Sequence, residues 1–186
     1  ESIKMSKIEL RDVPRYTYEE YELWKGDWEL MSGIPIAMSP SPMITHQSVC
    51  REITVLLSDA LEDCPEREVL YEIDWVIDEE NVLRPDIVVI CDSDDKEYVT
   101  KAPKIIFEVI SKSTAHNDRV IKHKIYEEEG VLYYAIVDPD TKLAKVYVLK
   151  DGRYIKLIDA STEKVKFTLG ECELEVDFGR VWKGIR

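Results

Sequence analysis

Two apolar runs rich in β-branched side chains restrict the fold of this chain more than any other feature. The first covers residues 87–90, and the second covers residues 104–110, where three isoleucines, a phenylalanine and a valine accompany one acid. Unbroken apolar runs of this length are typical of strands that are covered on both faces of a sheet. We therefore expect a central sheet with other elements packed on each side.

Helical and strand-like patterns surround these two runs. Apolar residues recur at helical spacing over residues 45–62, and a second helix is predicted over residues 115–129, ended by Gly130. Thr17 is expected to cap a short helix over residues 18–25, and Ser32-Gly33 predicts a hairpin between residues 28–31 and 34–38. Strict alternation predicts one strand over residues 69–78. Further strands are predicted over residues 131–137, 143–149, 154–158 and 165–168.

This order of elements predicts the α/β (α+β) class, with a mixed central β-sheet flanked by α-helices and an N-terminal β-hairpin. The length of 186 residues suits a single domain over residues 1–186. No apolar run approaches the roughly 18 residues that span a bilayer, so no membrane association is expected. The four cysteines lack CxxC spacing, which favours reduced, buried thiols in a cytoplasmic protein.

Two acids occupy positions where an acid is unexpected. Asp86 directly precedes the first run, and Glu108 lies inside the second. A carboxylate in a buried strand costs several kcal/mol unless it is paired or binds a metal. Neighbouring strands would bring both acids to one end of the sheet, where they and the main-chain carbonyl of Val109 would suit Mg²⁺ or Mn²⁺. The alternative is that each acid faces solvent or pairs with a base, such as Arg84 for Asp86.

The helix that follows supplies a third component. Asp118, Lys122 and Tyr126 recur every four residues and therefore share one stripe of the helix. A lysine beside two metal-binding carboxylates could orient a water molecule or stabilise charge on a phosphoryl group. The alternative is a surface ion pair between Asp118 and Lys122, which would contribute a few tenths of a kcal/mol.

Weaker candidates complete the set. Glu29, on the predicted hairpin, could add a third acid. His46 opens the long helix, where it could contact phosphate or the site, or serve as a structural or capping residue. Tyr126 is expected to line the site rather than to act in catalysis, and His116 and His123 are expected to be exposed.

Several short motifs in this chain occur in an order and spacing found in one family. They are residues 38–42 (MSPSP) with His46-Gln47, Arg84-Pro85-Asp86, residues 107–111 (FEVIS), Ser113-Thr114, Asp118-Arg119, Lys122, Tyr126, Gly130-Val131 and residues 133–139 (YYAIVDP). From about Tyr18 to Trp182 the chain resembles the Uma family of restriction-endonuclease-like proteins, within the PD-(D/E)XK nuclease superfamily.

The resemblance implies that Asp86 is the metal-binding aspartate of the PD motif and that Glu108 is the acid of the (D/E)XK motif. Ile110 stands where the superfamily has lysine, and the family pattern points to Lys122 as its replacement, with Asp118 orienting it. The implied activity is Mg²⁺- or Mn²⁺-dependent endonuclease cleavage of phosphodiester bonds, with DNA as the expected substrate and a homodimer as the expected assembly.

The charge of the chain keeps an alternative open. The formal net charge is −13, whereas nucleic-acid binders usually carry a basic surface because phosphate neutralisation supplies much of their affinity. A local basic strip could compensate, built from Lys101, Lys104, Lys112, Arg119, Lys122 and Lys124. The acidity and Ile110 instead favour a non-catalytic module that binds nucleic acid or protein and retains the nuclease fold.

Overall fold

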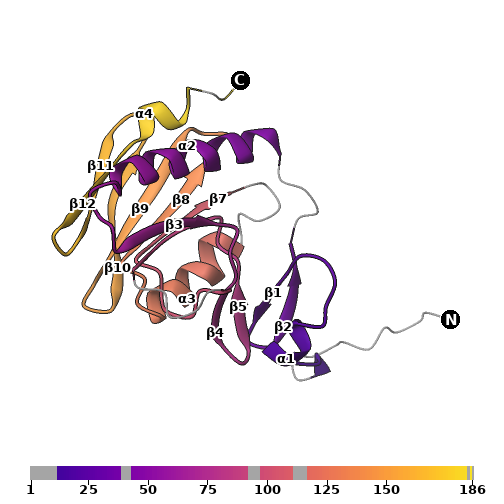
Figure 1. Cartoon of the computed structure of the whole chain (residues 1–186). Helices are drawn as coiled ribbons and strands as arrows, with labels where there is room; N and C mark the ends of the chain where they lie inside the picture. Colours follow the sequence, from indigo (N-terminus) through magenta and orange to yellow (C-terminus); the bar gives the residue numbers. More distant parts are fainter. Residues whose placement is uncertain (1–11, 39–42, 92–96, 111–116, 184, 186) are drawn as a thin grey trace.

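A six-stranded sheet forms the centre of the molecule in the computed structural model (Figure 1). Its order is β10-β9-β8-β7-β6-β3, in which β7 and β8 are parallel and the other pairs antiparallel. The strands are β3 (Arg67–Tyr71), β6 (Ile87–Cys91), β7 (Ile105–Val109), β8 (Tyr133–Asp138), β9 (Leu143–Lys150) and β10 (Arg153–Ala160). The structure describes residues 12–38, 43–91, 97–110, 117–183 and 185, apart from the side chains of residues 117–119.

Both faces of the central strands are covered, which explains their unbroken apolar sequence. In β6, Ile87 and Val89 enter one hydrophobic core, while Val88 and Ile90 enter a second core on the opposite face. The strand β7 divides its side chains between the two cores in the same way. Successive side chains of a strand point to opposite faces, so a strand between two cores needs apolar residues at every position. The predicted mixed sheet with covered faces is confirmed.

The first core lies beneath the long helix α2 (Ile44–Ala60), which crosses one face of the sheet (Figure 1). Val49, Ile53 and Leu57 of α2 are fully buried at helical spacing, so the predicted helix over residues 45–62 is confirmed. The same core includes β11 (Lys164–Leu169) and β12 (Cys172–Asp177), which form a two-stranded sheet, and the short helix α4 (Phe178–Val181). The sequence pattern did not predict β12 or α4.

A four-stranded sheet of order β2-β1-β5-β4 lies beside the second core. Its strands are β1 (Trp28–Met31), β2 (Ile34–Ala37), β4 (Trp75–Asp78) and β5 (Asn81–Leu83). The predicted hairpin is confirmed, with Trp28 opposite Ala37 and Met31 opposite Ile34. The preceding helix α1 (Tyr18–Tyr21) is shorter than predicted, and Thr17 caps it through Glu20.

The single strand predicted over residues 69–78 is wrong. The strand β3 ends at Tyr71, and the next residue, Glu72, has a φ of 49°, which interrupts an extended chain. After this interruption, β4 begins at Trp75 and joins the four-stranded sheet instead of the central one. One alternating pattern therefore covers two strands in different sheets, because alternation alone carries no information about the bend between them.

The helix predicted over residues 115–129 has two parts in its described portion. A π-helix covers Asn117–Lys122, and α3 continues over His123–Glu128. Gly130 follows with a φ of 79°, which agrees with its predicted role in ending the helix. Residues 115 and 116 and residues 39–42 of the MSPSP motif lie outside the described residues.

The expectation of four reduced cysteines is wrong for one pair. Cys64, which follows α2, forms a disulfide with Cys172 at the start of β12, and their Cα atoms are 6.2 Å apart. The two residues are 108 positions apart in the sequence, so only the folded chain brings them together. Cys50 and Cys91 are free. The cytoplasmic location stays a prediction. Reduced thiols were the argument for it, and the disulfide removes Cys64 and Cys172 from that argument. Within the described part of the chain, no helix has the length and apolar character needed to cross a membrane.

Candidate functional site

The strands β6 and β7 bring the two unexpected acids to the same end of the central sheet. The strands pair with Ile87 opposite Phe107, and this register continued by one residue places Asp86 opposite Glu108. Cβ atoms of directly opposite residues lie about 5 Å apart in an antiparallel pair. The amide of Val109 also donates a hydrogen bond of 2.7 Å to Oδ2 of Asp86. Asp86 therefore contacts the strand that carries Glu108.

A buried ion cluster surrounds Glu108. The Nζ atom of Lys122 lies 3.0 Å from Oε1 of Glu108 and 2.9 Å from Oε1 of Glu29. The exposed fractions of Glu108, Glu29 and Lys122 are only 2%, 4% and 4%. The hydroxyl of Tyr126 donates a hydrogen bond of 2.6 Å to Oε1 of Glu108. Side chains from β1, β7 and the helix after β7 thus meet at one buried point.

The helical spacing explains why Lys122 and Tyr126 reach the same carboxylate. They are four residues apart and lie on the buried side of their helix, whereas Val120 is 55% exposed. The alternative of a surface ion pair is wrong for Lys122, because that side chain is buried. The predicted partner Asp118 has no described side chain, so its orienting role lies outside the described residues.

The phenol of Tyr126 lies among acidic side chains. Burial raises the pKa of Tyr126 well above its usual range, and the charges of Glu108 and Glu29 raise it further. The phenol therefore stays protonated and remains a hydrogen-bond donor to Glu108. Together with Asp86, which contacts the amide of Val109, Glu29 and Glu108 bring three carboxyl groups to this end of the sheet.

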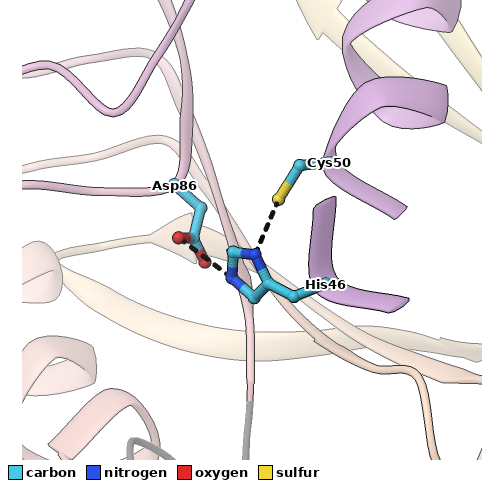
Figure 2. Close-up of side chains that lie close together, drawn as sticks. All are labelled: His46, Cys50 and Asp86. Carbon is cyan, nitrogen blue, oxygen red and sulfur yellow. Dashed lines mark hydrogen bonds and ion pairs between the residues drawn. The ribbon is translucent and has the colours of Figure 1, made fainter. Parts of the chain in front are cut away.

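Asp86 has a partner that differs from the one considered in the sequence. The Nε2 atom of His46, near the start of α2, lies 3.2 Å from Oδ1 of Asp86, as Figure 2 shows. The alternative pairing with Arg84 is wrong, because Nε of Arg84 lies 2.6 Å from Asp74 and its Nη1 lies 2.8 Å from Asp27. The carboxylate of Asp86 therefore points towards α2 and β7 instead of the guanidinium two residues earlier.

The weaker candidates fall into different environments. Glu29 joins the buried cluster, and its Oε1 also accepts a hydrogen bond of 2.9 Å from the amide of Arg84. The expectation that His123 is exposed is wrong, because three tyrosine rings surround it with centroids 5.0–5.9 Å away. Burial lowers the pKa of His123. His116 lies outside the described residues.

The predicted basic strip is only partly on the surface. Lys101, Lys104 and Lys124 are exposed, whereas Lys122 is buried in the cluster and cannot contribute to a surface strip. The side chains of the remaining two members, at positions 112 and 119, are not among those described. The described part of the strip therefore has three exposed lysines, of which Lys124 lies 3.7 Å from Glu128.

One residue near Asp86 was not considered as part of the site. Cys50 lies on α2 with its Sγ atom 3.7 Å from Nδ1 of His46. The four-residue spacing of His46 and Cys50 on a predicted helix could have indicated this contact, because residues at that spacing share one face. Each of the two was instead interpreted alone.

The fold and the family of the chain agree with each other. A crystal structure described as a "putative nuclease belonging to DUF820", from Anabaena variabilis ATCC 29413, matches this chain with a TM-score of 0.72. The match covers 89% of this chain and 97% of that one at 16% sequence identity, which shows that the two share a fold. The class defined by the fold is thus a mixed α/β protein with a central mixed sheet.

The family model Uma2, described as "Putative restriction endonuclease", matches residues 18–175. The chain belongs to this family, and the resemblance found in its short motifs is confirmed. A search of curated proteins gave no match.

Proposed function

We propose that this protein is a metal-dependent nuclease that hydrolyses phosphodiester bonds, with DNA as its expected substrate and Mg²⁺ or Mn²⁺ as its cofactor. The observation that carries the proposal is the negative charge gathered at the end of β6 and β7. Glu29 and Glu108 are almost completely buried, Asp86 accepts a hydrogen bond from the amide next to Glu108, and Lys122 lies between Glu29 and Glu108.

The donor atoms of this cluster fit a hard divalent cation. Carboxylate oxygens and main-chain carbonyls are the ligands that Mg²⁺ and Mn²⁺ prefer. Carboxylates gathered in a largely buried place repel one another, and a divalent cation bound among them would offset this repulsion. Asp86, Glu108 and the carbonyl of Val109 would hold the ion, which would supply Lewis-acid stabilisation and a water of lowered pKa when bound.

The other side chains hold a fixed positive charge beside these ligands. Lys122 is anchored between Glu29 and Glu108, where its ammonium can stabilise negative charge that develops on a phosphoryl group or orient a water. Tyr126 donates a hydrogen bond to Glu108 and thereby orients that carboxylate. Because these groups are buried and mutually bonded, their positions are set before any substrate arrives.

The departure from the superfamily motif also fits this arrangement. Ile110 stands where the motif has lysine, and its side chain is buried in the second core. Lys122 reaches Glu108 from the following helix at 3.0 Å. Electrostatic stabilisation depends on where the ammonium lies in space, so a lysine from the helix can serve the same purpose.

Cleavage assays with Mg²⁺ or Mn²⁺ test the proposal on duplex DNA, single-stranded DNA and RNA. We expect cleavage by the wild type, and a loss of roughly 100-fold or more in Asp86→Asn and Glu108→Gln, the scale for single groups that stabilise a transition state. Asp63→Asn is the control, because Asp63 is an exposed acid beyond the other end of α2. If no nucleic acid is cut with either ion, the proposal is wrong.

A second candidate is a binding module that keeps the fold without catalysis, which the net charge of −13 favours. Titration with Mg²⁺ or Mn²⁺ separates the two, since a module without a working centre has no ion-dependent rise in melting temperature. Asp86→Ala is not a suitable test of the binding module. The substitution would leave the amide of Val109 and the ring of His46 without this partner.

A homodimer remains part of the proposal. Two copies would provide two centres, one for each strand of a duplex. Light scattering of the purified protein measures the mass directly, and a monomer at concentrations that support duplex cleavage would contradict this part.

A further inference from the structure

A second set of possible metal ligands lies on the α2 side of Asp86. His46 and Cys50 are four residues apart on α2, and Figure 2 shows the imidazole between the thiol and the carboxylate of Asp86. Nδ1 of His46 lies 3.7 Å from Sγ of Cys50, and Nε2 lies 3.2 Å from Oδ1 of Asp86. One ligand atom from each of the three residues can be chosen so that all lie within 4.8 Å of one another.

These donors match a thiophilic ion in type and spacing. Thiolate, imidazole and carboxylate are the three side-chain ligands of Zn²⁺, with bonds of about 2.0–2.3 Å, which place ligand atoms roughly 3.3–3.8 Å apart around a tetrahedral ion. The distance between Sγ of Cys50 and Nδ1 of His46 already lies in this range. Asp86 contacts the other ring nitrogen, Nε2, so the imidazole must turn for one of its nitrogens to share an ion with both Cys50 and Asp86. Two ligands four residues apart on a helix share one face, as in the paired histidines of helical zinc sites. Three protein ligands leave a fourth position for water.

A nucleophilic role for Cys50 has less support. The thiol is buried, and burial raises its pKa, with the charges of Asp86 and Glu72 raising it further. A thiol in such surroundings stays protonated and unreactive. A bound cation reverses this balance locally, because coordination displaces the thiol proton to solvent.

We propose that His46, Cys50 and Asp86 form a binding site for a divalent cation of the zinc class, and that this ion competes with Mg²⁺ or Mn²⁺ for Asp86. The binding site stands on its own geometry, whereas the competition rests on the proposed nuclease function. Mg²⁺ selects oxygen ligands and Zn²⁺ accepts sulfur and nitrogen, so the two ions use different sides of the same carboxylate. An ion bound on the α2 side holds the carboxylate of Asp86 away from the Mg²⁺ or Mn²⁺ centre that Asp86 shares with Glu108. Occupation of this site would therefore inhibit the proposed nuclease.

Cobalt spectroscopy tests the binding site without any assay of activity. Co²⁺ replaces Zn²⁺ and produces a thiolate-to-cobalt charge-transfer band when a cysteine is a ligand. We expect this band in the wild type and in Cys91→Ser, which removes the other free cysteine, and no band in Cys50→Ser. The affinity for Co²⁺ should fall at least about tenfold in Cys50→Ser, since even the loss of an outer-shell partner costs roughly 10–100-fold. Circular dichroism verifies the fold of each variant. No band in the wild type, or a band that depends on Cys91, overturns the site.

Mn²⁺ release tests the competition separately. Electron paramagnetic resonance counts free Mn²⁺, and we expect added Zn²⁺ to release bound Mn²⁺ from the wild type and Cys91→Ser but not from Cys50→Ser. Release that is equal in all three proteins overturns the competition. A protein that shows the cobalt band but binds no Mn²⁺ contradicts the proposed nuclease centre and the competition, while the thiophilic site stands. A protein that binds Mn²⁺ without the band contradicts the site alone.

Discussion

Replacement of Lys122 by methionine should destabilise the protein strongly. Methionine retains most of the apolar stem of lysine and removes the ammonium, so the change acts mainly on charge. The ammonium lies 2.9 Å from Glu29 and 3.0 Å from Glu108, and all three residues are at most 4% exposed. Removal of one partner from a buried ion cluster leaves uncompensated charge and typically costs about 3–5 kcal/mol. We expect a loss of that size in the free energy of unfolding.

Urea unfolding followed by circular dichroism measures this loss, with a chelator present so that no divalent ion replaces the missing charge. Lys124→Met is the matched control on the same helix. The ammonium of Lys124 is 3.7 Å from Glu128, and its side chain is 74% exposed. Exposed pairs at this spacing contribute a few tenths of a kcal/mol, so the control should change stability by less than about 0.5 kcal/mol.

A second substitution distinguishes lost charge balance from lost packing. Glu108→Gln alone should destabilise the wild type, because it weakens the pairing of Lys122. In the Lys122→Met background the same change should restore part of the stability, since it removes a carboxylate that has lost its counter-ion. A loss below about 1 kcal/mol in Lys122→Met, or the same sign for Glu108→Gln in both backgrounds, would refute the electrostatic account of the cluster.

Three other predictions concern the disulfide, the half-buried His123 and a turn. Cys64→Ala with Cys172→Ala should lower the free energy of unfolding in urea by roughly 2–5 kcal/mol, because the bond closes a loop of 108 residues. Burial lowers the pKa of His123, so the folded protein binds this proton less tightly than the unfolded chain. The stability from the neutral ring is therefore complete above about pH 6.5 and declines below it. The melting temperature of His123→Phe should fall less between about pH 7 and about pH 5 than that of the wild type, and equal falls would contradict the assignment. Gly33→Ala should cost more than Gly152→Ala in thermal unfolding: both have positive φ, but only at Gly33 would a new Cβ approach another atom to 2.9 Å.

The central strands could be predicted because a nearly continuous apolar sequence indicates burial on both faces of a strand. Residues 87–90 and 105–110 contain an apolar side chain at nearly every position, and both faces of β6 and β7 are buried. The acids Asp86 and Glu108 were conspicuous for the same reason, since an acid in such a run needs a partner. Local sequence therefore indicated where the structure brings acidic side chains together, and two of these acids.

Contacts between distant segments could not be predicted in this way. Nothing in the residues around Cys64 indicates that β12 brings Cys172 to it, and the partner of Asp86 turned out to be His46 instead of the neighbouring Arg84. The interrupted strand at Glu72 has a similar cause, because a positive φ at one residue leaves the alternating pattern intact. Pairings of this kind depend on how the layers pack.

The position of Lys122 depends both on local sequence and on how distant segments pack. Its place in a stripe with Tyr126 was readable from helical spacing, but its burial against Glu29 depends on the four-stranded sheet, whose β1 carries that acid. The hairpin therefore supplies the carboxylate of Glu29, which helps to hold the ammonium of Lys122 beside Glu108. A lysine on the strand at position 110 would lie two residues from Glu108 and need no such anchor. Once the lysine is on a helix, the chain needs a third element to fix it, which explains why a glutamate is buried in β1.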